Sequence, residues 1–259
     1  MEDVDRWLAK IRYRTTEEGR QWLNEEQYQM VEEVASRVKK ELVAEGAEQG
    51  DPGEPLRWLM HGGPGTGKSH VIRVIKDELF GRVLGWQIGV NYQVVALQAV
   101  MAEMLGGDTI HHALGIPVYT RRGENHDDDM QSHVRVAKAA LQWRWLIIDE
   151  ISMVSAKLLA QMDMKLRGVV RQIGTQKIQK GKDQPFGGLN ILCSGDFWQL
   201  DPPDGGFLGN IPTEFISRGR KYRIPGCAEH SSRAVTHLGR SRTWATRNDR
   251  IENLRTVRR

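Results

Sequence analysis

At 259 residues and 39% hydrophobic content, the chain is long enough to bury a sizeable core as one large α/β domain with flanking segments. Its net charge of +4 is unevenly distributed, because residues 216–259 hold 12 Lys+Arg against 3 Asp+Glu and the rest of the chain is acidic. An acidic body excludes long-range attraction of a polyanion, so a nucleic acid would have to bind in a local groove. Two cysteines, Cys193 and Cys227, exclude a disulfide scaffold and a cysteine-only zinc site.

Localisation signals are missing from the N-terminal sequence. Residues 1–5 carry acid where a secretory or mitochondrial presequence needs base, and no apolar run reaches membrane-spanning length. We therefore expect a protein of a reducing interior compartment, cytosol or nucleus, with no membrane partner.

The first predicted helix begins after a lead segment, residues 1–22, to which no element is assigned. Asn24 precedes two glutamates, a combination that caps a helix and suits the positive end of its dipole. Valines and a leucine then recur at helical spacing until Gly46 ends the pattern. The following Gly-, Pro- and acid-containing stretch, 44–55, predicts a surface loop.

A phosphate-binding loop follows a predicted strand at 56–60 and precedes a helical stretch at 70–80. Its glycines let successive backbone N–H groups point at phosphate oxygens, while a lysine adds a cation and a serine hydroxyl can bind Mg²⁺. The alternative is a chance match in a Gly-rich loop, but the order of strand, loop and helix argues against it. The loop consists of Gly62, Gly63, Pro64, Gly65, Thr66, Gly67, Lys68 and Ser69.

Strands and helices alternate through the rest of the chain. We predict strands at 93–97, 145–149 and 190–194 and helices at 99–105, 130–142 and 155–170, with a turn at 106–108 and a solvated acidic loop at 124–129. This alternation predicts a P-loop α/β fold with a parallel sheet and helices on both faces. From about Ser217 the apolar residues lose all periodicity, so we expect residues 216–259 to be a basic, disordered tail.

The apolar strand at 145–149 ends in the acid Asp149, and a second acid, Glu150, follows it. At the carboxyl end of such a strand, Asp149 would lie beside the phosphate loop and bind Mg²⁺, and Glu150 would orient and deprotonate the attacking water. The alternative is a strand that merely ends in a solvated acidic turn.

Gln199 follows the strand at 190–194, in the segment Gly195-Asp196-Phe197-Trp198-Gln199-Leu200. A glutamine amide can donate to a phosphate oxygen and accept from water, which suits a γ-phosphate sensor. Considered without its neighbours, Gln199 would be an ordinary loop residue.

Three segments, 62–69, 147–154 and 195–200, resemble in order and spacing motifs I, II and III of the petite-integration-frequency (Pif/RecD-like) superfamily-one DNA helicases. Residues 23–27 are similar to the family's Q motif, and residues 106–111 to the stretch after motif Ia. The resemblance covers 23 to about 212 and implies a RecA-like first motor domain at 23–215.

The resemblance implies an ATP-dependent, Mg²⁺-requiring helicase that moves 5′ to 3′ on single-stranded DNA, acts in genome maintenance and is nuclear in preference to mitochondrial or cytoplasmic. By position, Gln27 reads the adenine, Lys68 contacts the β- and γ-phosphates, Ser69 and Asp149 bind Mg²⁺, Glu150 activates water and Gln199 senses the γ-phosphate. DNA contacts are expected around Gln98, Ala99 and the turn 109–112.

The sequence departs from the family pattern in three places. Gln98-Ala99 replaces the Thr-Gly pair of motif Ia, and Asp201 is inserted before the Pro-Pro pair that follows motif III. Motifs IV to VI, and with them a second motor domain and its arginine fingers, are not found. Losing such an arginine lowers the rate of phosphoryl transfer roughly 10³- to 10⁵-fold, so nucleotide binding should survive in this chain while fast turnover should not.

Several interpretations stay open. The arginine-rich tail either binds phosphate backbone or is the frameshifted or mis-spliced end of a longer helicase, and we favour the second. The chain itself is either a helicase motor domain or a nucleotide-binding module that is catalytically inactive and binds DNA or a partner. Another P-loop ATPase, assembled as a ring that borrows its arginine from a neighbour, is disfavoured by the segment 195–200. The sequence does not specify the oligomeric state.

Overall fold

The computed structural model describes residues 2–47, 50–117, 134–173, 184–198, 202–203 and 208. The predicted acidic loop 124–129, Gln199 and the tail 216–259 lie outside these residues. The chain divides into two compact units, one formed by Met1–Leu56 with Gly67–Gln87 and the other by Arg57–Thr66 with Ile88–Arg259.

The first unit is helical. It contains α1 (Glu2–Arg12), α2 (Glu25–Glu45), α3 (Lys68–Arg73) and η1 (Val74–Val83), in which η1 continues α3 with π-helical hydrogen bonding. Helices α1 and α2 both pack against η1 and against each other. The predicted helix at 70–80 is therefore confirmed, and it begins two residues earlier, at Lys68.

Helix α1 lies in the lead segment 1–22, for which no helix or strand was predicted. Val4, Leu8 and Ile11 recur at helical spacing and are all buried, so one face of this short helix packs into the unit. Acids in its first turn and bases in its last turn complement the helix dipole.

Helix α2 begins with a capping box. The Asn24 side chain accepts a hydrogen bond from the backbone N–H of Gln27 at 2.8 Å, and the Gln27 side chain accepts one from the backbone N–H of Asn24 at 3.1 Å. These two bonds satisfy N–H groups that a helix start otherwise leaves unpaired. The predicted start after Asn24 and end at Gly46 are both confirmed.

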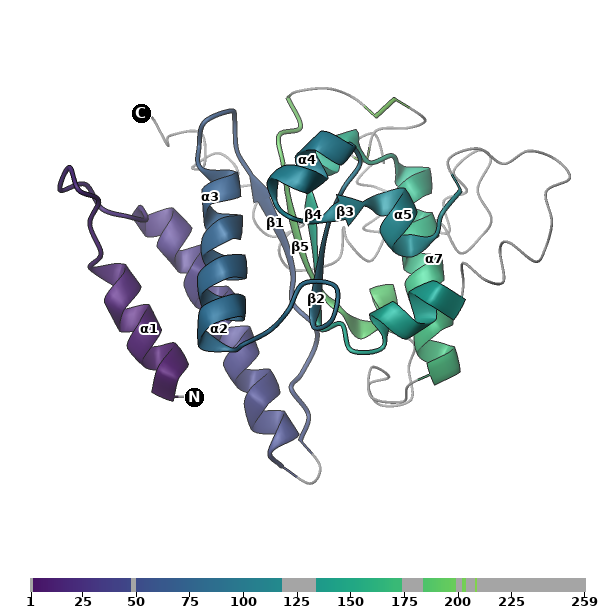
Figure 1. Ribbon diagram of the computed structural model, residues 1–259, viewed down its shortest axis with the longest axis horizontal. Coiled ribbons are helices and arrows are strands. Elements are labelled where there is room, and N and C mark those ends of the chain that lie inside the picture. Colours follow the sequence, from purple (N-terminus) through teal and green to yellow (C-terminus); the bar gives the residue numbers. More distant parts are fainter. Residues whose placement is uncertain are drawn as a thin grey trace, which may run out of the picture. The chain divides into compact units, whose positions relative to one another are not determined.

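The second unit is built on a five-stranded parallel sheet, ordered β1-β5-β4-β2-β3 (Figure 1). Every residue of β2, β4 and β5 is buried, as expected of strands in the middle of a parallel sheet. The strands are β1 (Arg57–His61), β2 (Tyr92–Ala96), β3 (Asp108–Thr109), β4 (Trp145–Asp149) and β5 (Asn190–Gly195). The predicted parallel α/β fold is confirmed.

Helices α5 (Ile110–Leu114) and α7 (Ala156–Ile173) pack over one face of this sheet (Figure 1). Alternate strand residues such as Val95, Ile148 and Ile191 form a common core with them. Further elements of the unit are α4 (Ala99–Met104), a helix at 134–140, η2 (Ile151–Met153) and η4 (Pro185–Gly188).

One local prediction is wrong. The stretch 109–112, expected to be a turn, is the start of α5, because the Thr109 hydroxyl accepts a hydrogen bond from the backbone N–H of His112 at 3.2 Å and caps the helix. Asp108 and Thr109 moreover form β3, at the edge of the sheet.

Candidate nucleotide and DNA site

The phosphate loop leaves the carboxyl end of β1. The backbone N–H of Gly62 donates to the carbonyl of Gly195 at 3.3 Å, and the Thr66 hydroxyl donates to the carbonyl of Gly63 at 2.9 Å, which closes the loop on itself. A Cβ on Gly62 would lie 2.8 Å from the Thr66 hydroxyl oxygen, so the closed loop requires glycine there. The hydrogen bonds and the missing Cβ together fix the curled backbone that anion binding needs.

The last glycine of the loop belongs to the helical unit. Gly67 adopts a left-handed conformation with φ 86°, and a Cβ there would lie 2.5 Å from the side-chain nitrogen of Gln27. Lys68 then opens α3, and Ser69 follows in its first turn. Within the helical unit, Gln27, predicted to read adenine, therefore lies next to Gly67, the residue before Lys68.

Asp149 is the last residue of β4 and only 6% exposed. Ser194 on the neighbouring strand β5 donates a short hydrogen bond from its hydroxyl to the carboxylate of Asp149. This contact was not predicted, although the parallel pairing of Ile148 with Cys193 places the two side chains on adjacent strands at the same level. Such a donor orients a carboxylate that binds a metal.

Glu150 adopts φ 51° and ψ 49°, a left-handed conformation that is uncommon outside glycine. It turns the chain from β4 into η2. Strained residues of this kind cluster at functional sites.

A second buried acid, Asp196, follows β5. It is 2% exposed, accepts a hydrogen bond from the backbone N–H of Trp198 at 3.0 Å, and lies 3.7 Å from Nε2 of His61. The His61 ring in turn stacks on Phe197, with ring centroids 5.6 Å apart. These contacts hold the start of the segment that leads to Gln199, which itself lies outside the described residues.

The region predicted to contact DNA follows β2 and β3, on the opposite side of the sheet from β1. Gln98 precedes α4 and Ala99 begins it. Near the start of α5, Nδ1 of His112 makes a short contact with the carboxylate of Asp108, and Arg135 donates to the backbone carbonyl of His112 at 3.0 Å. Asp108 lies in the segment 106–111 that resembles the family, whereas the contact of Arg135 was not predicted, since 23 residues separate Arg135 from His112.

The register of the sheet brings Thr109 and Asp149 to the same level, at the carboxyl ends of the strands. Ala96 pairs with both Thr109 and Asp149, and His61 pairs with Gly195. The carboxyl ends of β1, β5, β4, β2 and β3 therefore lie side by side. Ligands of open parallel α/β sheets bind at this edge.

The donors in the predicted metal site fit Mg²⁺, which prefers oxygen ligands and keeps several waters. They are a hydroxyl at Ser69 and a carboxylate at Asp149. In the part of the chain that the structure describes, no group of three His, Cys, Asp or Glu side chains could hold a metal ion, so an all-protein metal cage is not present there. Nor is any described helix long and apolar enough to cross a membrane.

Comparison with known proteins decides the family. Residues 22–205 match the model of the PIF1-like helicase family. The chain belongs to this family. Among relatives, the ATP-dependent DNA helicase PIF1 of Saccharomyces cerevisiae is 34% identical over 167 residues, and human PIF1 is 30% identical over 167 residues.

Each of these PIF1 matches spans 62% of this chain but only 17% of the yeast protein and 22% of the human one. Solved Pif1 structures are also similar. The Pif1 helicase from Bacteroides, in complex with ADP-AlF3 and single-stranded DNA, is 23% identical with a TM-score of 0.47, and the match covers 78% of this chain and 38% of that one. The Pif1 helicase from Candida albicans is 24% identical with a TM-score of 0.48, and the match covers 70% of this chain and 34% of that one.

Proposed function

We propose that this chain is the first motor domain of an ATP-dependent DNA helicase, which binds and hydrolyses ATP with Mg²⁺ and contacts single-stranded DNA in 5′-to-3′ movement. The observation that carries the proposal is the arrangement of three segments in a PIF1-like chain. The start of the phosphate loop, the acids Asp149 and Glu150 and the segment after β5 all lie at the carboxyl ends of the adjacent strands β1, β4 and β5. We assign it to residues 23–215, with 1–22 as a lead segment and 216–259 as a tail.

In the proposed mechanism, backbone N–H groups of the loop 62–67 and the ammonium of Lys68 bind the β- and γ-phosphates. Ser69 and Asp149 would hold a Mg²⁺ ion, which would neutralise charge on the phosphate oxygens. Glu150 accepts a proton from the attacking water. Gln199 would sense the γ-phosphate and Gln27 the adenine edge.

Contacts with single-stranded DNA are proposed at Gln98, Ala99 and the stretch 109–112. The hydrogen bond between Asp108 and His112 and the hydrogen bond from Arg135 would fix the backbone of this stretch. Roles in DNA repair, recombination and telomere maintenance, and a nuclear location, belong to this proposal as well.

The experiment is a titration of the full chain with a fluorescent ATP analogue, with and without Mg²⁺. Lys68→Ala should weaken Mg²⁺-dependent binding at least about tenfold, the equivalent of about 1.4 kcal/mol, whereas Lys40→Ala, an exposed lysine of the same unit, should leave it unchanged. Equal affinity of both variants would refute the proposal.

A second measurement separates the motor from an inactive nucleotide-binding module. ATP hydrolysis by the pure chain should rise when single-stranded DNA is added, and Glu150→Gln should abolish this rise without weakening binding. Tight nucleotide binding with no DNA-stimulated hydrolysis would instead assign the chain to the inactive module.

A further inference from the structure

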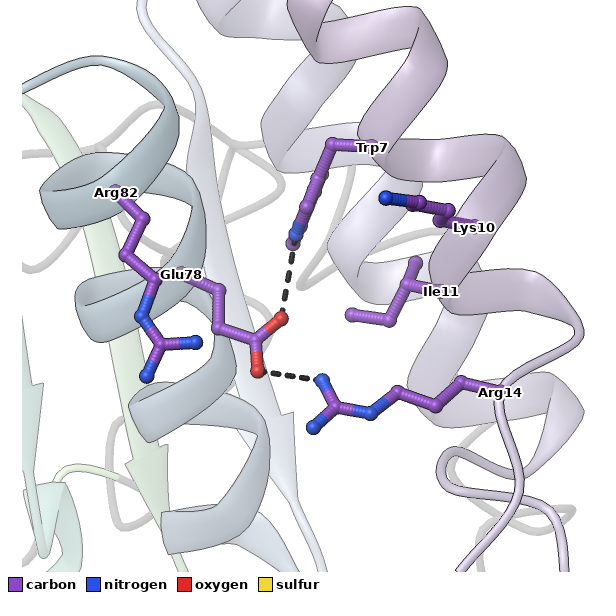
Figure 2. A pocket seen from close by; sticks show the side chains of 6 residues that line it. All are labelled: Trp7, Lys10, Ile11, Arg14, Glu78 and Arg82. Carbon is purple, nitrogen blue, oxygen red and sulfur yellow. Dashed lines mark hydrogen bonds and ion pairs between the residues drawn. The ribbon is translucent and has the colours of Figure 1, made fainter.

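A pocket of about 460 Å³ lies in the helical unit, between α1 and η1 (Figure 2). None of its residues belongs to the nucleotide motifs or to the segments proposed to contact DNA. Its volume lies in the range of sites that bind small ligands or single anchoring side chains. It is lined by Trp7, Lys10, Ile11, Arg14, Glu78 and Arg82.

One carboxylate organises the pocket. Glu78, whose side chain is 15% exposed, accepts a hydrogen bond from the indole N–H of Trp7 at 3.3 Å and one from the guanidinium of Arg14 at 2.7 Å (Figure 2). Arg14 also lies 4.2 Å above the ring of Trp22, a cation–π contact. The charges of Glu78 and Arg14 therefore balance, and the side chains that shape the pocket are held in place before any ligand binds.

The remaining charges are unbalanced. Lys10 and Arg82 are exposed, and neither has a hydrogen bond or an ion pair within the described residues. They come from opposite walls, α1 and η1, and between them the half-buried ring of Trp7 supplies apolar surface, while Ile11 is only 2% exposed and contributes little. The pocket thus offers an apolar floor with two unpaired cations at its rim.

We propose that this pocket binds an acidic peptide segment of a partner protein, with one apolar side chain packed against the ring of Trp7 and flanking carboxylates paired with Lys10 and Arg82. A buried apolar anchor carries most of the energy of such contacts, and complementary rim charges add specificity and association rate.

A nucleic-acid strand fits this pocket less well. Single strands bind along continuous basic grooves with their bases stacked on aromatic faces, whereas here the pocket is discrete and a carboxylate, Glu78, occupies its centre (Figure 2). A phosphodiester chain would bring charge along its whole length past that carboxylate. A peptide can place its acids at the rim alone.

The test measures fluorescence anisotropy of a fluorescein-labelled ten-residue peptide, one central phenylalanine among aspartates, on the full chain at about 0.15 M salt. We expect Lys10→Glu with Arg82→Glu to weaken binding at least tenfold. The matched control, Arg20→Glu with Lys40→Glu, changes net charge equally at exposed positions of the same unit outside the pocket and should alter affinity less than threefold. Replacing the phenylalanine of the peptide by alanine should also weaken binding at least tenfold.

Each contrary outcome overturns the proposal. Equal weakening by both charge-reversed pairs would reduce the effect to general electrostatics, and equal binding of the alanine peptide would remove the apolar anchor. No binding of the peptide at all would exclude the peptide as occupant. Displacement of bound peptide by a ten-nucleotide thymidine strand would assign the pocket to nucleic acid, and circular dichroism of every variant verifies that it is folded.

Discussion

Glu150, the residue proposed to activate water, has a strained backbone conformation. A left-handed conformation costs a residue with a Cβ roughly 1–2 kcal/mol, and glycine avoids this cost. We therefore predict that Glu150→Gly is more stable than Glu150→Ala by about 1 kcal/mol, the reverse of the order in a helix. Urea denaturation of the two variants measures the difference. If the alanine variant is the more stable, the φ of 51° does not describe the protein in solution.

Cys193 makes the stability of the sheet depend on alkaline pH. Burial raises the pKa of its thiol from 9.0 to about 12. Between these values the unfolded chain loses a proton that the folded chain keeps, so the free energy of unfolding falls as pH rises, by up to about 1.4 kcal/mol per pH unit.

The measurement is urea unfolding at pH 8 and pH 10. Cys193→Ala should lose about 1.4 kcal/mol less stability over this interval than the unsubstituted chain. Identical losses in both would contradict a buried, protonated Cys193 thiol.

At the scale of elements, the capping box stabilises the start of α2. Asn24→Ala removes the acceptor for the backbone N–H of Gln27 and should cost about 1 kcal/mol. Asn24→Asp keeps an acceptor and should cost much less. Thermal unfolding measures both costs, and an undiminished melting temperature in Asn24→Ala would show that the box does not stabilise α2.

Local patterns of the sequence predict most elements of the fold. The strand at 145–149 is exact, and the helix starting after Asn24 is correct at both ends, because apolar periodicity and caps act over a few residues. What escaped prediction depends on distant partners. Buried Asp163 accepts from the backbone N–H of Phe186 at 2.6 Å and so fixes a left-handed turn 23 residues away.

The contacts around the candidate site show the same division. Motif spacing predicts roles for Lys68, Asp149 and Gln27, whereas the contacts of Ser194 and Arg135 emerged only from the strand register and the packing of the helix at 134–140. A serine in a strand or an arginine on a helix carries no local signal of its role. That signal exists only once the parallel register is known.

At the scale of the whole molecule, residues proposed to act on one nucleotide lie far apart in the sequence. Lys68 and Ser69 open α3, Asp149 is the last residue of β4, and Glu150 follows it. Substitutions of residues that act on one ligand have non-additive effects on its binding free energy, whereas substitutions of independent residues have additive effects. The joint action of Lys68 and Asp149 can therefore be measured.

The most direct test is a double-mutant cycle on the Mg²⁺-dependent affinity for a non-hydrolysable ATP analogue, with Lys68→Ala, Asp149→Asn and the double variant. We predict that each single variant weakens Mg²⁺-dependent binding at least about tenfold, and that the double variant falls short of the sum by more than about 1 kcal/mol. Additive effects, or an Asp149→Asn variant whose affinity responds to Mg²⁺ as before, would contradict the claim that both residues serve one magnesium–nucleotide complex.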